Sequence, residues 1–393
     1  MHSNILIIGG GHAGGMLSIA LRKNKYSGSI TIVGEEPYLP YQRPPLSKNY
    51  LDGKINHERI LLKSIDFYKK NAIELMTNQY AESVNINKSM VKLKNGKNLS
   101  FDNLIFATGS VMKKIKYKNQ EDIHYLRTID DSKLLREQLG IKKSLVIIGG
   151  GYIGLEIASI AIKKNLKVTV LEIENRLLKR NVCSQISDFF AEKHRKAGVN
   201  ICLDKVIENI SKDQKNKNIV CKDGEIIPAD FVIAGIGVKP NTLLAENAGI
   251  KCEDGVLVNE FCQTSETNIF AIGDCANHIS SFSGERIRLE SVQNAVDQAM
   301  VVSSFIIGEK KPYTNIPWFW SDQYDVKLKI IGINKGYDQT VMRGSVKNEK
   351  FAIFYLKNKR LIAADTINNP KDFSLAKKLI NQGTVSGNEF DLV

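Results

Sequence analysis

The chain has 393 residues, 43% of them hydrophobic, and a formal net charge of +13. These values predict a globular protein of two or three domains. No apolar run approaches the ~20 residues needed to span a bilayer, which excludes a membrane-spanning helix. Lysines are spread along the chain rather than clustered, which disfavours nucleic acid as a partner. The first predicted strand begins soon after Met1 without a basic leader, so we expect a cytoplasmic protein.

A glycine fingerprint follows the first predicted strand. Residues 5–8 are all Ile or Leu, and residues 9–14 read GGGHAG. In a G-x-G-x-x-G turn the first glycine allows a tight bend, the second lets the backbone approach a pyrophosphate, and the third lets the helix pack on the strand. The next predicted strand, residues 29–34, ends at Glu35, whose carboxylate can accept hydrogen bonds from a ribose.

The same pattern returns in the middle of the chain. Residues 145–148 form an apolar strand, residues 149–154 read GGGYIG, and the strand at 167–171 ends at Glu172. A strand at 231–237 repeats the pattern of residues 103–109, and a hairpin is expected near 219–227. This is the repeat of a whole domain, and two dinucleotide sites in one chain suggest that electrons pass between two dinucleotides.

Asp274 ends a further apolar stretch, residues 267–274, and the helix expected next covers 291–307. Ligands of open α/β sheets bind at the carboxyl ends of the strands, so Asp274 is a candidate ligand residue, with a helix N-cap as its alternative role. The sequence pattern changes near residue 316.

The last part of the chain predicts an α+β domain. Trp318 and Trp320, whose ordinary alternative is an aromatic core, precede four predicted strands and a closing amphipathic helix. The predicted strands cover 327–333, 339–344, 351–356 and 360–364, and the helix covers 373–381.

The fold class predicted is therefore α/β, with two Rossmann-like dinucleotide-binding domains in a glutathione-reductase-like arrangement and a C-terminal α+β domain. We expect a discontinuous first dinucleotide-binding domain (residues 1–110 and 241–315), a second dinucleotide-binding domain (111–240) and a C-terminal α+β domain (316–393).

The six cysteines are scattered and form no C-x-x-C pair, so we expect reduced, mostly buried thiols and no metal site.

Three stretches carry a resemblance that runs nearly end to end: PYQRPPLSK (residues 40–48), RLESVQNA (288–295) and PWFWSDQY (317–324). The chain resembles the FAD- and NAD-dependent reductases of electron-carrier proteins, above all the ferredoxin reductases of bacterial oxygenase systems, the group of putidaredoxin reductase. Rubredoxin reductases and apoptosis-inducing factor resemble it more distantly.

The resemblance implies which residues meet each cofactor. It implies an FAD site at Gly9, Gly11, Ala13, Gly14, Glu35, Arg43, Lys48, Ala81, Arg127, Asp274, Val292 and Trp318. The second fingerprint would hold NAD through Gly149, Gly151, Tyr152, Ile153, Gly154 and Glu172.

Lys48, Glu156 and Trp318 are the candidate catalytic residues. We expect an ion pair between Lys48 and Glu156 beside the flavin on the nicotinamide side, where pairing keeps a partly buried lysine charged. The ordinary alternatives are a surface lysine and a solvated glutamate in the first helical turn. Tyr152 is expected to cover the flavin until nicotinamide displaces it, and Glu172 would repel a 2′-phosphate, which favours NADH over NADPH.

The resemblance implies a flavoprotein that passes electrons from NADH through FAD to a small iron–sulfur carrier, a ferredoxin or rubredoxin, in the service of an oxygenase. One alternative, an NADH-dependent disulfide or peroxide reductase, needs a redox cysteine, and residues 38–48 contain none. The other is a redox-sensing interaction flavoprotein, which would be reduced slowly by NADH. The basic charge suits an acidic carrier, and we expect a monomer or weak homodimer without membrane contact.

Overall fold

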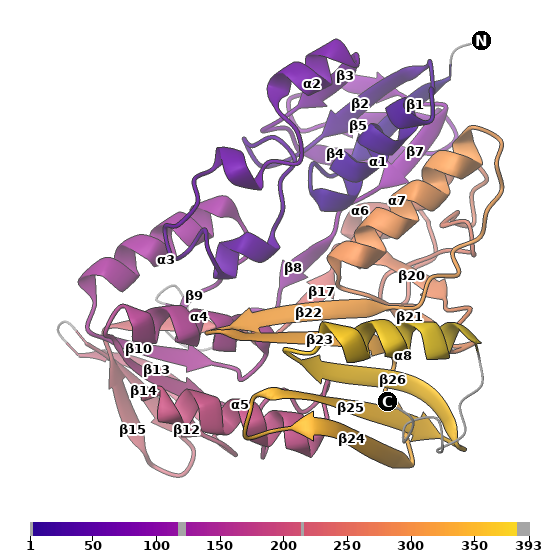
Figure 1. Cartoon of the computed structure of the whole chain (residues 1–393). Helices are drawn as coiled ribbons and strands as arrows, with labels where there is room; N and C mark the ends of the chain where they lie inside the picture. Colours follow the sequence, from indigo (N-terminus) through magenta and orange to yellow (C-terminus); the bar gives the residue numbers. More distant parts are fainter. Residues whose placement is uncertain (1–2, 117–122, 214–215, 383–393) are drawn as a thin grey trace. The chain divides into compact units, whose positions relative to one another are not determined.

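The computed structural model describes residues 3–116, 123–213 and 216–382, which fold into two compact units (Figure 1). The first unit comprises Met1–Arg43, Asn56–Val111 and Val238–Pro317, and the second comprises Pro44–Ile55, Met112–Gly237 and Trp318–Val393. The expected three-domain division stays a prediction.

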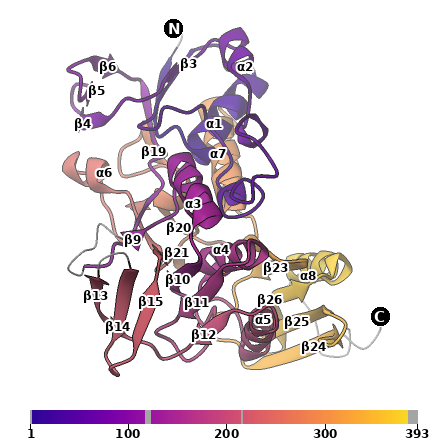
Figure 2. The ribbon, with the colours of Figure 1, turned by 90° about the vertical axis from the view of Figure 1, so that its left-hand side faces the viewer.

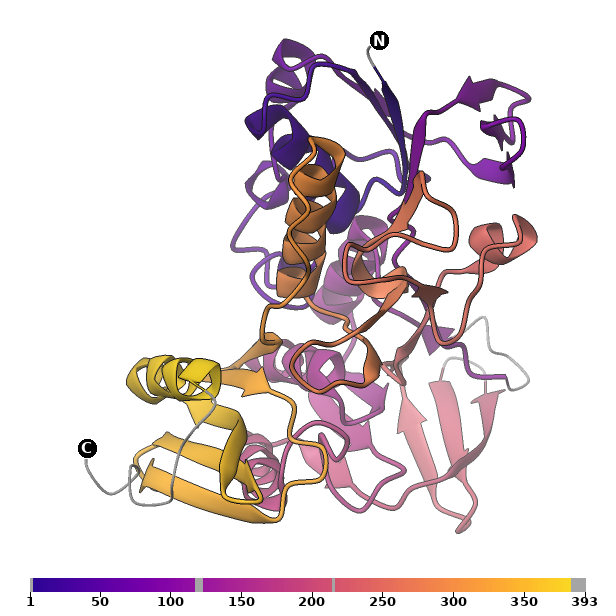
Figure 3. The same cartoon turned by 90° about the vertical axis from the view of Figure 1, so that its right-hand side faces the viewer.

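A five-stranded parallel sheet forms the centre of the first unit, in the order β19-β7-β1-β2-β3. Its strands are β1 (Asn4–Ile8), β2 (Ser29–Val33), β3 (Ile73–Met76), β7 (Asn103–Phe106) and β19 (Ile269–Ala271). Helices α1 (His12–Lys23) and α7 (Val292–Ile306) pack against each other (Figure 1 and Figure 3).

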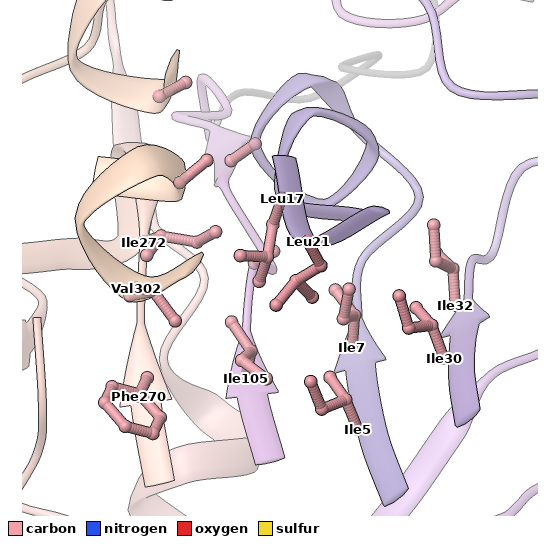
Figure 4. Packing of buried hydrophobic residues seen from close by; sticks show 14 of the residues in the cluster. Ile5, Ile7, Leu17, Leu21, Ile30, Ile32, Ile105, Phe270, Ile272 and Val302 are labelled. Carbon is pink, nitrogen blue, oxygen red and sulfur yellow. The ribbon is translucent and has the colours of Figure 1, made fainter. Parts of the chain in front are cut away.

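Strand β1 shows why this sheet has two apolar faces. Successive side chains of a strand point to opposite faces. Ile5 and Ile7 therefore enter a core with Leu17 and Leu21 of α1 (Figure 4), whereas Leu6 enters a second core on the other face. An almost continuous apolar run is typical of a parallel strand covered on both sides.

Small antiparallel elements complete the first unit. Figure 2 shows β4 (Ala81–Asn85), β5 (Met90–Leu93) and β6 (Asn98–Ser100) side by side. The remaining elements are η2 (Glu58–Ile60), α2 (Ile65–Lys70), β17 (Val238–Pro240), α6 (Leu243–Asn247), β18 (Val256–Leu257), η4 (Gly273–Cys275), β20 (Ala276–Ile279) and β21 (Arg286–Arg288).

The second unit contains its own parallel sheet, in the order β12-β11-β10-β16-β9. Its strands are β9 (Ile123–His124), β10 (Ser144–Ile148), β11 (Lys167–Leu171), β12 (Asn200–Cys202) and β16 (Phe231–Ala234). The accompanying elements are η1 (Pro44–Ser47), α3 (Ile129–Ile141), α4 (Tyr152–Lys163), α5 (Ser184–Lys196), β13 (Ile207–Asp213), β14 (Asn216–Cys221) and β15 (Ile226–Ala229), while β8 (Ser110–Met112) spans the boundary between the units.

An antiparallel sheet in the order β22-β23-β26-β25-β24 closes the chain. It comprises β22 (Trp318–Gln323), β23 (Val326–Gly332), β24 (Gln339–Ser345), β25 (Lys350–Lys357) and β26 (Arg360–Ile367). Helix α8 (Pro370–Gln382) packs on β26 and β23 (Figure 1).

The structure confirms the four predicted C-terminal strands and the hairpin near 219–227, and α7 differs by one residue at each end from the expected helix. It adds β22, which the sequence did not predict because three consecutive aromatic residues, Trp318 to Trp320, mask the alternation of a strand. The stretch before Asp274 is also shorter as a strand than expected, because Gly273 turns the chain at φ +77° into η4.

A buried carboxyl group lies inside the C-terminal sheet. Asp365 of β26 is fully buried and accepts a hydrogen bond from the Tyr355 hydroxyl, which in turn accepts the Cys183 backbone N–H at the start of α5. Burial raises the pKa of Asp365 to about 7, although the Tyr355 bond acts in the opposite direction.

We predict that Asp365→Asn flattens the dependence of stability on pH. Because the folded-state pKa of Asp365 is raised, the folded protein binds more protons than the unfolded one between pH 4 and pH 7, and stability falls as pH rises through that window. The fall corresponds to roughly 4 kcal/mol. Thermal unfolding from pH 4 to pH 8 measures it, with exposed Asp188→Asn as control; equal slopes in wild type and Asp365→Asn would contradict the assignment.

Candidate functional site

The first glycine turn connects β1 to α1 and has one open position. A Cβ at Gly9 would overlap the Ala107 carbonyl oxygen, and one at Gly14 would overlap the carbonyl oxygen of Gly9. Among the described residues, a Cβ at Gly11 would meet only the Arg43 guanidinium, at 3.9 Å. Two glycines are therefore required by packing of the protein itself, and the middle one leaves its space to a ligand.

The second turn, between β10 and α4, repeats this arrangement. A Cβ at Gly149 would overlap the Gly235 carbonyl oxygen, and one at Gly154 would overlap that of Gly149. At Gly151 the nearest atom would be the Gly235 oxygen, 3.9 Å away. Gly11 and Gly151 are also the N-caps of α1 and α4 and carry no capping side chain, so the N–H groups of each first turn face the open position.

Glu35 follows β2 and Glu172 follows β11, and the surroundings of the two carboxylates differ. The Glu172 carboxylate accepts the Gly150 N–H at 2.6 Å and the Glu174 N–H at 2.9 Å, so it is fixed beside the second turn. Glu35 has a pKa raised by desolvation and then by the adjacent charge of Glu36.

Glu36 is a residue of this site that the sequence analysis missed. It forms an ion pair with Arg43 at 2.7 Å and accepts a hydrogen bond from the Tyr41 hydroxyl. Tyr41 and Arg43 belong to the motif at 40–48, and the acid four residues before it was the available signal.

Charged groups and a neutral histidine surround the first turn. The pKa of His12 is lowered to about 4 by burial and by the positive charge of Arg43, against the opposing effect of Asp274. His12 Nδ1 is buried without a hydrogen-bond partner among the described residues. The open glycine, the cation and the orphaned ring nitrogen all fit the phosphate end of a dinucleotide.

Asp274 is held in η4 by two hydrogen-bonded neighbours. Its Oδ2 accepts the Ser110 hydroxyl at 2.8 Å, and the preceding Gly273 donates its N–H to the Gln298 side chain of α7 at 2.7 Å. The alternative role as helix N-cap is wrong, since Ser291 is the residue that caps α7, at Asn294 N. Val292 is accordingly the first residue of α7.

The expected ion pair between Lys48 and Glu156 is confirmed in the second unit. Lys48 Nζ lies 2.8 Å from Glu156 Oε1, and the Ser321 hydroxyl donates to the same oxygen at 2.6 Å. The Ser47 hydroxyl donates to Oε2. The alternative of a solvated glutamate is wrong: α4 begins at Tyr152, so Glu156 lies in its second turn and is 3% exposed.

Three aromatic residues, Trp318 to Trp320, directly precede Ser321 in β22. The Tyr152 ring packs on Phe319 at 4.8 Å, and burial raises the pKa of its hydroxyl, with Asp365 adding to the rise. Trp318 contacts Trp320 at 5.4 Å between ring centroids.

The remaining predicted residues divide between the two units. Ala81, at the start of β4, belongs to the first unit, and Arg127, before the capping box of α3, belongs to the second with Lys48 and Trp318. Their roles toward a cofactor stay predictions, as does that of Ile153, which is 41% exposed.

The cysteine side chains are buried or partly buried. All six cysteines are free, and burial raises the pKa of the fully buried Cys275 thiol. No group of three or more His, Cys, Asp or Glu side chains at residues 3–116, 123–213 and 216–382 is arranged to hold a metal ion. Over the same ranges, no helix is long and apolar enough to cross a membrane.

Two parallel sheets, each with an open glycine turn and an acid at the next strand end, define a class: oxidoreductases that bind two dinucleotides. The chain matches the pyridine nucleotide-disulphide oxidoreductase model over residues 3–299 and the reductase C-terminal model over residues 318–389. It belongs to the pyridine nucleotide-disulphide oxidoreductase family, whose cofactors are FAD and NAD(P)H.

Relatives cover the chain almost completely. Putidaredoxin reductase CamA of Pseudomonas putida is 38% identical over 387 residues, 96% of this chain and 92% of that protein. The ferredoxin reductase for the CYP199A2 system from Rhodopseudomonas palustris has a TM-score of 0.95 at 38% identity, covering 98% of this chain and 96% of that one. The covalent putidaredoxin reductase–putidaredoxin complex has a TM-score of 0.94 at 37% identity, covering 97% and 93%.

We predict that the two open glycines separate the two cofactors. Gly11→Ala and Gly151→Ala should both fold, since neither Cβ meets an atom of residues 3–116, 123–213 or 216–382 closer than 3.9 Å. Gly11→Ala should lose FAD on gel filtration, whereas Gly151→Ala should keep FAD and raise the KM for NADH by about tenfold, because the Cβ enters pyrophosphate space. Gly140→Ala, with nothing within 4 Å, is the matched control; FAD loss in Gly151→Ala but not in Gly11→Ala would contradict the assignment.

Proposed function

We propose that this protein is an NADH-dependent reductase that passes electrons through FAD to a small iron–sulfur protein, a ferredoxin or rubredoxin, of an oxygenase system. The observation that carries the proposal is the pair of open glycine turns on two separate sheets of one chain. The near full-length similarity to putidaredoxin reductase supports the choice of an electron-carrier protein as acceptor.

FAD, when bound, accepts a hydride from NADH and releases its electrons one at a time, which matches a two-electron donor to a one-electron carrier. The chain's residues bind and orient around that chemistry. The first turn, with Arg43 and Asp274, would bind FAD, together with Ala81, Val292 and Arg127, and Trp318 would lie near the flavin ring. The second turn would bind NADH.

Lys48 and Glu156 are proposed as the catalytic pair on the nicotinamide side of the flavin. The buried carboxylate of Glu156 forms an ion pair with the Lys48 amine at 2.8 Å. A fixed ammonium group at this position would stabilise negative charge that develops on the bound flavin.

Glu172 supports NADH over NADPH. Its carboxylate is fixed at the second turn by the Gly150 and Glu174 N–H groups. A ribose hydroxyl can donate to this carboxylate, whereas a 2′-phosphate would meet a like charge that cannot turn away.

The two alternatives predict other behaviour. A disulfide or peroxide reductase needs a reactive thiol, but Cys275 is fully buried and donates to backbone carbonyls, and residues 38–48 contain no cysteine. A redox-sensing interaction protein would be reduced slowly by NADH. The six free thiols suit a reducing compartment, and we place the protein in the cytoplasm.

We predict NADH-dependent reduction of one or more members of a panel of purified [2Fe–2S] ferredoxins and rubredoxins, followed by stopped-flow and steady-state absorbance. The kcat/KM with NADH should exceed that with NADPH by at least about tenfold, because like charges at Glu172 disfavour the phosphate. Cys275→Ser should retain carrier reduction. Slow flavin bleaching by NADH, or turnover that disappears with Cys275 while FAD stays bound, would contradict the proposal in favour of one alternative.

A further inference from the structure

A line of hydrogen bonds leads away from Glu156 through the second unit. Ser321 Oγ lies 2.6 Å from Glu156 Oε1, and Gln323 Nε2 lies 3.2 Å from Ser321 Oγ. Gln323 Oε1 then lies 2.9 Å from His194 Nε2, and the Tyr324 hydroxyl lies 3.0 Å from His194 Nδ1. Ser321, Gln323 and His194 are fully buried.

The chemistry of the groups fixes the direction of every bond in this line. Burial lowers the pKa of His194 to about 4, so the ring is neutral at pH 7, with one donor nitrogen and one acceptor nitrogen. The Gln323 oxygen that faces Nε2 can only accept, so Nε2 carries the proton, and Nδ1 accepts the Tyr324 hydroxyl. The Gln323 amide then donates to Ser321, and Ser321 donates to Glu156.

We propose that a hydrogen-bonded chain of four side chains positions the Glu156–Lys48 pair. Its members are Ser321, Gln323, His194 and Tyr324. The chain aims the Ser321 hydroxyl at Glu156 Oε1, the same oxygen that Lys48 contacts. Ser47 holds the other carboxylate oxygen, so the carboxylate cannot rotate about its last bond. The inference rests on the proposed function, in which this pair lies beside the flavin.

The positions of the members in the fold explain why the chain is rigid. His194 lies on α5, and Ser321 and Gln323 lie on β22, two residues apart and therefore on one face of the strand. Tyr324 begins the turn from β22 to β23 at φ +58°, a conformation that few side chains adopt without a local reason. Gln323, with both ends of its amide bonded, connects the helix to the catalytic carboxylate.

A purely structural role, in which the chain only holds α5 to β22, makes a different prediction for the FAD-loaded enzyme. Ser321→Ala removes the final donor and should lower the limiting rate of flavin reduction at saturating NADH about tenfold, with the dissociation constant for NADH unchanged, since a hydrogen bond to a charged group is lost. Ser321→Thr, which keeps the hydroxyl, should recover the rate.

Thr366→Val is the matched control, because it removes another buried hydroxyl of the same sheet, bonded to the Lys329 carbonyl at 3.3 Å. It should leave the limiting rate within about twofold of wild type, even where the two variants lose similar thermal stability. If Ser321→Ala and Thr366→Val reduce the rate equally, the positioning role is overturned while the proposed function stands. If wild-type enzyme is not reduced by NADH, the proposed function itself fails.

A second measurement tests the chain without any turnover. In ¹⁵N spectra of the imidazole-labelled FAD-loaded protein at pH 7, the His194 signals, assigned by their loss in His194→Phe, should show a protonated Nε2 and a bare Nδ1. Tyr324→Phe should shift the Nδ1 signal by removing its donor. The opposite tautomer, with a bare Nε2 and a protonated Nδ1, reverses the donor direction and overturns the proposal.

Discussion

The close approach of helix and strand at the two glycine turns is the constraint on which the site depends. Gly14 and Gly154 bring the first turn of each helix against the carbonyl oxygen of the glycine that leaves the strand. Because of this contact, Gly11 and Gly151 face an open position, and the N–H groups of the helix are directed into it. One packing requirement, met twice, therefore leaves two open positions in one chain that suit a phosphate.

The buried carboxylate of Glu156 is the second organising feature. It receives donors from the loop that contains Ser47 and Lys48 and from Ser321 of the C-terminal sheet. Segments far apart in the sequence thus meet at one charge, and a buried charge without such donors would cost several kcal/mol. This explains why residues 44–55 fold with the second unit, although they follow the first glycine turn in the sequence.

Much of this could be predicted from the sequence, because the signals are local. Apolar strands, glycine spacing and terminal acids predicted both parallel sheets, and the Lys48–Glu156 pair is confirmed. The hydrogen-bonded side chains from Ser321 to His194 could not be predicted. They connect residues more than a hundred positions apart through bonds that no periodicity encodes. Strand β22 and the partners of Glu36 were missed for related reasons: consecutive aromatics conceal alternation, and an ion pair depends on how a loop folds back.

In the proposed function the two turns bind different dinucleotides at once, one resident and one exchanging. The most direct measurement is the stoichiometry of binding to the purified protein. After gel filtration the protein should retain one FAD per chain and no NAD, and titration with NAD⁺ by calorimetry should then add one equivalent without displacing FAD. Two FAD molecules per chain, or competition between NAD⁺ and FAD for a single site, would contradict it.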